Sequence, residues 1–284
     1  MKIKTLAAAA ALVLAAPAFA AIAPGLSGNG ELFLNVYDSA TQVSYAFDTG
    51  VFMDDFFAQG QAESGAQLSF GVAALPLYQT FRSLAVTSNL RWSVVAIDST
   101  GSTAPGLQRL FSTVKTGDEA KVANQTNGNF TNGIGASQGG RFFDTVNSPN
   151  LQLAGQSTHV VVAADQVNFA INGNSYSQST DAGFGYYGKS GGLTPTYNGT
   201  ATYNAGNPLN VAASFDYVTR SGSTGINKVL VDVFNNSQNT GTWSFDGSTL
   251  QYNLTAAVPE PETYALMLAG LGGLMMMARR RRSA

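Results

Sequence analysis

Few side chains in this sequence have the chemistry that catalysis or tight metal binding needs. Cysteine is absent and His159 is the single histidine, so thiolate chemistry and cysteine-ligated metals are excluded. His159 precedes three valines where a strand is expected to begin, and no Gly-x-Ser-x-Gly turn accompanies it. We therefore interpret it as a strand-edge residue and not as a hydrolase base. We expect no catalytic residue, no bound metal and no cofactor.

Carboxylates suggest a weaker alternative, a glycoside-active enzyme. Asp54 and Asp55, with Glu63 nearby, would supply the pair of acids that such chemistry requires. Adjacent residues of a strand point to opposite faces, so this pair suits a shared task only inside a turn. We favour two solvated loop aspartates.

Calcium binding in a loop is a further alternative, at Asp98, Asp181 or Asp246. No segment has the alternating Asp and Asn ligands that make a calcium loop recognisable. We therefore expect no calcium site.

Tyrosines gather in residues 181–208, among asparagines, serines and threonines. Tyr186, Tyr187, Tyr197 and Tyr203 have the composition of a carbohydrate-facing loop, where aromatic rings stack on sugars. Tyrosine is also an ordinary residue of a half-buried sheet whose hydroxyl reaches water. We favour the sheet interpretation and keep contact with exopolysaccharide as the alternative.

The elements that must position these residues are strands. Runs of β-branched and aromatic residues alternate with clusters of Gly, Asn, Ser and Asp, the pattern of strands and turns. In the first run, Leu32, Leu34 and Val36 fall on one face and Phe33 and Tyr37 on the other. The expected strands span residues 31–37, 42–47, 67–72, 90–97, 108–114, 159–171, 209–218, 227–234 and 241–254.

The last of these runs contains Asp246 and Gly247 between two alternating segments, which predicts a hairpin. Helical periodicity is absent between the two ends of the chain. The sequence therefore predicts an all-β fold for residues 21–257, an antiparallel, jelly-roll-like β-sandwich in preference to a barrel. A signal-peptide helix and a C-terminal transmembrane helix flank it.

The first 20 residues form a secretory signal peptide. Lys2 and Lys4 precede an apolar run over residues 6–16, and Ala18 and Ala20 form a small-x-small cleavage site. We expect export through the Sec translocon and cleavage by signal peptidase after Ala20.

Residues 258–284 combine three parts. Pro259, Glu260 and Pro261 form an extended, accessible motif because proline fixes φ. The apolar residues 263–278 follow, and as a helix they would span about 24 Å, short for a hydrocarbon core of about 30 Å. Basic residues end the segment and are expected to stay in the cytoplasm. They are Arg279, Arg280, Arg281 and Arg282.

Residues 258–282 resemble the PEP-CTERM sorting signal of Gram-negative bacteria, which has the same three parts. Glu262 and Tyr264 stand where family members often carry a small residue and Trp. The resemblance implies that a membrane-embedded exosortase cleaves near Pro259–Pro261 and that the protein is sorted to the cell surface or released. Such proteins often accompany exopolysaccharide and biofilm formation. The alternative is a single-span anchor that is never processed.

The net charge of the region between the two terminal signals limits the classes of partner that this region could bind. This region carries nine basic and fifteen acidic side chains, a net charge of −6, which argues against nucleic acid as a partner. We expect a non-enzymatic structural or interaction protein of the cell surface or extracellular matrix, which occupies the inner membrane only transiently. The alternative is a carbohydrate-binding module for exopolysaccharide.

Overall fold

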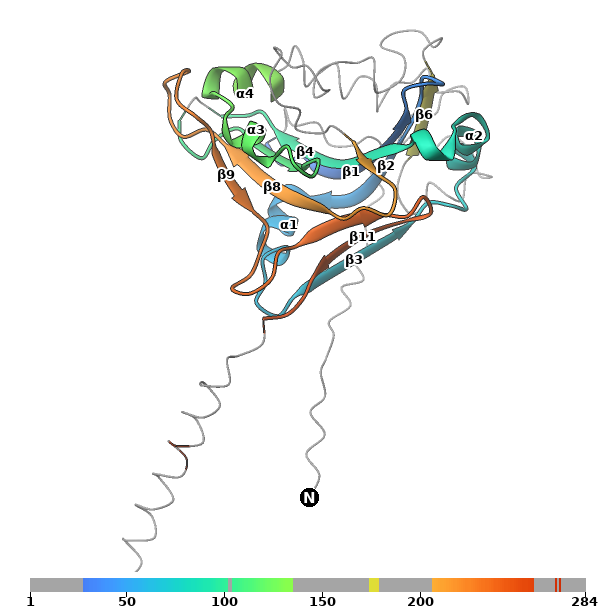
Figure 1. The fold of residues 1–284 in the computed structure, drawn as a ribbon. Helices are drawn as coiled ribbons and strands as arrows, with labels where there is room; N and C mark the ends of the chain where they lie inside the picture. Colours follow the sequence, from blue (N-terminus) through green and yellow to red (C-terminus); the bar gives the residue numbers. More distant parts are fainter. Residues whose placement is uncertain are drawn as a thin grey trace, which may run out of the picture.

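The computed structural model describes residues 28–101, 104–134, 174–178 and 206–257, with the single positions 269 and 271. Strands dominate this part of the chain (Figure 1), which confirms the all-β prediction. The strands are β1 (Glu31–Asp38), β2 (Val43–Phe52), β3 (Ala66–Gly71), β4 (Arg91–Asp98), β5 (Arg109–Thr113), β6 (Asn174–Gln178), β7 (Asn207–Pro208), β8 (Ala213–Thr219), β9 (Leu230–Val233), β10 (Thr242–Phe245) and β11 (Thr249–Leu254).

All the described strands belong to one antiparallel sheet, in the order β3-β11-β10-β8-β5-β4-β1-β2-β6, with β7 on β4 and β9 on β8. Strand β8 joins the two parts of this path, because its start pairs with β10 while its remainder pairs with β5. A single hydrogen-bonded path is not two separate sheets, so the jelly-roll sandwich is not confirmed. The predicted hairpin is confirmed as β10 and β11, with Gly247 at φ 93° in its turn.

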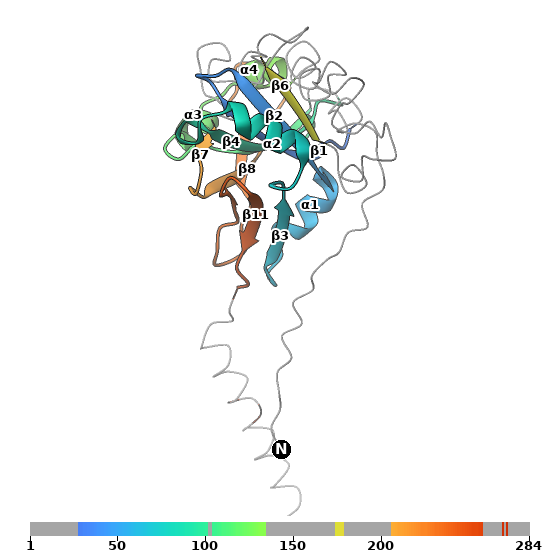
Figure 2. The same cartoon turned by 90° about the vertical axis from the view of Figure 1, so that its right-hand side faces the viewer.

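The sheet curls so that β3 and β11 lie on one side of the domain and β2 and β6 on the other (Figure 2). The rings of Phe47 on β2 and Phe70 on β3 are 6.1 Å apart, although these strands lie near opposite ends of the strand order. Helix α2 (Pro76–Leu84) packs against β2 and β6, and its Tyr78 hydroxyl donates a hydrogen bond to the carbonyl oxygen of Gly247. The helix therefore links the two ends of the curled sheet.

Each face of the sheet buries its own apolar core, as the alternation in β1 requires. Leu32, Leu34 and Val36 point into the larger, inner core with α1 (Met53–Gln59) and α2. Phe33 points into a second core on the other face. The second core includes Val122 of α3 (Glu119–Ala123) and Phe130 of α4 (Asn127–Ile134).

The prediction that helices occur only at the ends of the chain is wrong. Four α-helices and a 3-10 turn (Thr87–Asn89) lie within the described residues. The α-helices have five to nine residues, too few for the 3.6-residue period to stand out from the sequence. Tertiary packing stabilises them, as at Phe130 of the glycine-containing α4, which is fully buried.

Candidate functional site: the stem of the C-terminal segment

The described domain ends on a short stem, residues 255–257, which continues from β11. Strands β11 and β3 pair up to Leu254 and Ala66. The chain then stays in contact with the segment before β3, because the Ala257 N–H donates a 2.9 Å hydrogen bond to the Glu63 carbonyl oxygen. One side of the stem is therefore bound to the loop that follows α1.

A turn between β9 and β10 binds the other side of the stem. The Asn236 side-chain amide donates to the Thr255 carbonyl oxygen at 2.7 Å. The Asn239 amide donates to the carbonyl oxygens of Thr255 and Ala256 at 3.3 and 3.4 Å. Two side-chain amides thus satisfy backbone acceptors that the end of the sheet leaves unpaired.

The same turn is held in shape from within and from the α1 loop. The Asn236 side-chain oxygen accepts the backbone N–H groups of Gln238 and Asn239 at 3.1 and 2.8 Å. The Glu63 carboxylate accepts the N–H of Ser237 at 3.0 Å and its hydroxyl at 2.7 Å. Glu63 therefore contacts the stem with its backbone and the turn with its side chain.

Gly65 completes the enclosure of the stem. Its φ is 78°, a left-handed conformation that favours glycine. A Cβ at this position would lie 2.6 Å from the Leu254 carbonyl oxygen and 2.7 Å from the Ala256 nitrogen. We call Glu63, Gly65, Asn236 and Asn239 the stem clamp.

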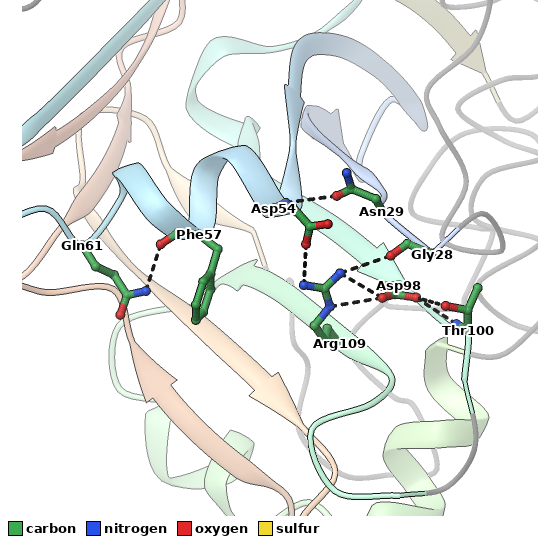
Figure 3. A network of polar contacts seen from close by, with 8 residues as sticks. All are labelled: Gly28, Asn29, Asp54, Phe57, Gln61, Asp98, Thr100 and Arg109. Atoms are coloured by element: carbon green, nitrogen blue, oxygen red, sulfur yellow. Dashed lines mark hydrogen bonds and ion pairs between the residues drawn. The ribbon is translucent and has the colours of Figure 1, made fainter.

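The predicted pair of acids, Asp54 and Asp55, lies away from the stem clamp, and its Asp54 forms an ion pair. Asp54 and Asp55 are in the first turn of α1, where consecutive side chains point about 100° apart. Asp54 Oδ1 is 2.7 Å from Nη1 of Arg109, and Asp98 Oδ2 is 3.0 Å from Nη2 of the same guanidinium (Figure 3). Arg109 therefore neutralises a carboxylate of the predicted pair.

Electrostatics of this network favour its charged form. Burial alone would lower the pKa of Arg109, but hydrogen bonds and charge from Asp54 and Asp98 outweigh it, so this pKa is raised. Asp98 also accepts the N–H and hydroxyl of Thr100 at 2.9 and 2.6 Å. A carboxylate committed to these donors has a structural task.

Of the residues considered for calcium, Asp98 and Asp246 bind protein groups in the structure, and Asp181 lies outside the described residues. Asp246 accepts the N–H groups of Ser248 and Thr249 at 2.6 and 2.7 Å and so caps the β10–β11 turn. Within the described ranges, no three carboxylate or histidine side chains come together in a way that could hold a metal ion.

Helix α1 places both ends of the described domain close to one another. The Asp54 N–H donates to the Asn29 side-chain oxygen at 3.0 Å, and Arg109 donates to the Gly28 carbonyl oxygen at 3.1 Å (Figure 3). The loop after the same helix carries Glu63 and Gly65 of the stem clamp. A seven-residue helix is about 10 Å long, so the first described residues and the stem lie at the two ends of one short element.

Most predicted sorting and binding residues lie outside the described residues, as does the strand expected at 159–171. These residues are Ala18, Ala20, His159, Asp181, Tyr186, Tyr187, Tyr197, Tyr203, Pro259, Glu260, Pro261, Arg279, Arg280, Arg281 and Arg282. Sequence reasoning did not find the stem clamp. The sequence does show a run of turn-forming residues at 235–239, which predicts a turn there. It does not indicate that this turn binds residues 255–257.

Comparison with known proteins bears on the end of the chain. No helix of the described residues is long and apolar enough to cross a membrane. No curated protein and no solved structure is detectably similar to this chain. Residues 257–282 match the family described as the PEP-CTERM protein-sorting motif. The chain therefore carries a PEP-CTERM sorting motif, which implies export and processing by an exosortase, and the motif begins at the last residue of the stem.

Proposed function

We propose that this chain is a non-enzymatic protein of the cell surface or extracellular matrix, delivered there by its two terminal signals. Residues 1–20 direct export through the Sec translocon and are removed by signal peptidase. Residues 263–278 then hold the chain in the inner membrane while Arg279–Arg282 remain in the cytoplasm. An exosortase cuts near Pro259–Pro261 and transfers or releases the β domain.

The observation that carries this proposal is the position of the sorting motif relative to the fold. The motif begins at Ala257, and Ala257 makes the last described backbone hydrogen bond of the domain, to Glu63. A cut beyond this residue would leave every described hydrogen bond of the stem intact. The β domain is thus suited to outlast the removal of its own membrane segment.

A structural or interaction role is supported by the way the described carboxylates are used. Asp54 and Asp98 bind Arg109, Glu63 binds the stem turn, and Asp246 caps a hairpin. A glycosidase needs two carboxylates that face one substrate, and these four are engaged in holding the fold. This use of the four carboxylates supports a task in attachment or assembly over glycoside hydrolysis.

The alternative is binding of exopolysaccharide through the tyrosine-rich segment. Tyr186, Tyr187, Tyr197 and Tyr203 lie among asparagine, serine and threonine residues, a composition with both stacking rings and hydrogen-bonding groups. The substitutions Tyr187→Ala and Tyr197→Ala separate the two roles. Carbohydrate binding requires weaker polysaccharide retention at unchanged thermal stability, and a structural role requires unchanged retention.

Sorting is tested in the producing host by fractionation of the wild type and of a variant that lacks residues 279–282. We expect the wild type in the surface and medium fractions and the variant in the cell envelope or the periplasm. Equal distribution of the two proteins would remove the proposed role of the arginines. A wild type retained in full length in the inner membrane would remove exosortase sorting.

A further inference from the structure

We propose that the stem clamp positions the chain for processing, with Asn236 and Asn239 as positioning residues. By holding residues 255–257 against the domain, they fix how much free chain separates the β domain from the membrane-embedded segment. This inference rests on the proposed function, because it assigns a task in exosortase processing to residues of the β domain itself.

The length of free chain follows from where the clamp ends. Residues 258–262 lie between Ala257 and the start of the apolar segment at Thr263. Even fully extended, this connection would span about 20 Å. A membrane-embedded enzyme must therefore reach the cut in a narrow gap beneath the folded domain.

The clamp is built to keep that gap constant. If the stem were free, residues 255–257 would add about 10 Å of reach. In the structure, the backbone N–H of Ala257 and the carbonyl oxygens of Thr255 and Ala256 are all bound. Gly65 leaves no room for the stem to shift toward β3, because a single added carbon would lie 2.7 Å from the Ala256 nitrogen.

The bonding of Asn236 and Asn239 is more specific than stabilisation of a turn requires. The turn is already formed by the Asn236 side-chain oxygen and by Glu63. The amide nitrogens of both asparagines donate to the stem, and that of Asn236 also donates to the Ala62 carbonyl oxygen at 3.5 Å. Asn236→Asp removes this amide but keeps the side-chain oxygen that accepts from the turn. Together with Asn239→Ala, it is therefore expected to loosen the stem and to leave the turn's contact with Glu63 in place.

The test is a pulse-chase measurement of precursor conversion in the producing host, with the full chain throughout. Deletion of Val258 shortens the free connection by one residue and leaves Pro259–Pro261 unchanged. We expect this deletion to slow conversion at least five-fold. Adding Asn236→Asp and Asn239→Ala removes the side-chain bonds to the carbonyl oxygens of the stem and leaves only its backbone bond to Glu63. We expect conversion to return to within two-fold of the wild type.

Two controls test whether the effect comes from the length of the connection. One tests the identity of the side chain at position 258, and the other tests a general loss of side-chain amides. Val258→Ser preserves the length and is expected to convert at the wild-type rate. The pair Asn124→Ala and Asn253→Ala removes two exposed amides that do not bind the stem and is expected to give no rescue. If the Asn236/Asn239 variant is not exported, Gly65→Ala provides a second way to displace the stem.

The outcomes distinguish this inference from the proposed function. A wild type that is never converted overturns both. A wild type that is converted normally, with a Val258 deletion that has no effect or is not rescued by stem release, overturns the positioning role alone. Slow conversion that is rescued by stem release and not by the control pair supports it.

Discussion

The Ala257 N–H donates a 2.9 Å hydrogen bond to the carbonyl oxygen of Glu63, and the Glu63 carboxylate accepts two hydrogen bonds from Ser237. One residue of the loop after α1 thus connects the last residues of the domain to the turn that encloses them. The sorting motif begins at the same Ala257. The border between fold and sorting segment is therefore a set of defined hydrogen bonds.

Substitution of Gly65 by alanine is expected to destabilise the domain more than the same substitution at Gly106. Both glycines have left-handed φ values, 78° and 77°, so both variants carry a backbone cost of about 1 kcal/mol. Of the two, only Gly65 would place its new Cβ within 4 Å of other atoms, those of Leu254 and of the stem residue Ala256. We expect a loss of about 3 kcal/mol at Gly65 and about 1 kcal/mol at Gly106, measured by urea unfolding of the exported protein. Equal losses would show that the stem is not packed against Gly65.

Removal of the Arg109 guanidinium is expected to cost about 3 kcal/mol of unfolding free energy, because Asp98 is buried and would lose its cationic partner. Arg109→Met keeps the aliphatic stem of the side chain. Lys121→Met removes the ion pair between Lys121 and Asp118. The Lys121 side chain is 62% exposed, so this substitution is expected to cost less than about 0.5 kcal/mol of unfolding free energy. Denaturant titration of the two variants checks this, and a cost at Arg109 as small as that at Lys121 would contradict the network.

Two adjacent phenylalanines of α1 are expected to differ in their contribution to stability. Phe56 is 1% exposed and lies 4.9 to 6.4 Å from five other rings in the inner core. Phe57 is 40% exposed. Phe56→Ala is expected to cost about 4 kcal/mol and Phe57→Ala about 1 kcal/mol. Thermal unfolding monitored by near-ultraviolet circular dichroism compares the two variants. A larger loss of stability for Phe57→Ala than for Phe56→Ala would contradict the orientation of α1 in the structure.

Buried Asp216 is expected to make stability depend on pH. Burial raises the pKa of its carboxyl to about 6 from 3.8; the Ser214 hydroxyl lowers it, and the charges of Glu119 and Asp232 add to the increase. The folded state therefore binds this proton more tightly than the unfolded chain, so the unfolding free energy falls as pH rises from about 4 to 6.

Asp216→Asn removes this titration. The variant is expected to be more stable than the wild type at pH 7, by up to about 3 kcal/mol, with the difference shrinking toward zero near pH 4. Urea unfolding of both proteins at several pH values measures the difference directly. A difference that is the same at pH 4 and pH 7 would contradict the assignment to Asp216.

The strands and the sorting motif could be predicted from the sequence because both are local patterns. Alternation of Leu32, Leu34 and Val36 placed them on one face, and the structure buries all three in the inner core. Phe33 was predicted on the other face and lies in the second core there. The PEP-CTERM motif is continuous in the sequence and was recognised from it.

The helices and the stem clamp could not be predicted, because tertiary contacts create them. Helix α4 contains asparagines and glycines that disfavour helix, yet it forms around the buried Phe130. Glu63 and Ser237 are 174 residues apart in the sequence, and no periodic pattern connects them. Asp54 was predicted to lie in a loop, but it lies in the first turn of α1 and pairs with Arg109.

Processing beyond the stem is tested by the intact mass of the protein recovered from the surface and medium of the producing host. We expect a chain that begins at Ala21 and ends within residues 258–262, so that the stem and its clamp remain. A mass that extends to Ala284 would contradict processing. A mass that ends before Ala257 would contradict the stem as the protected end of the domain.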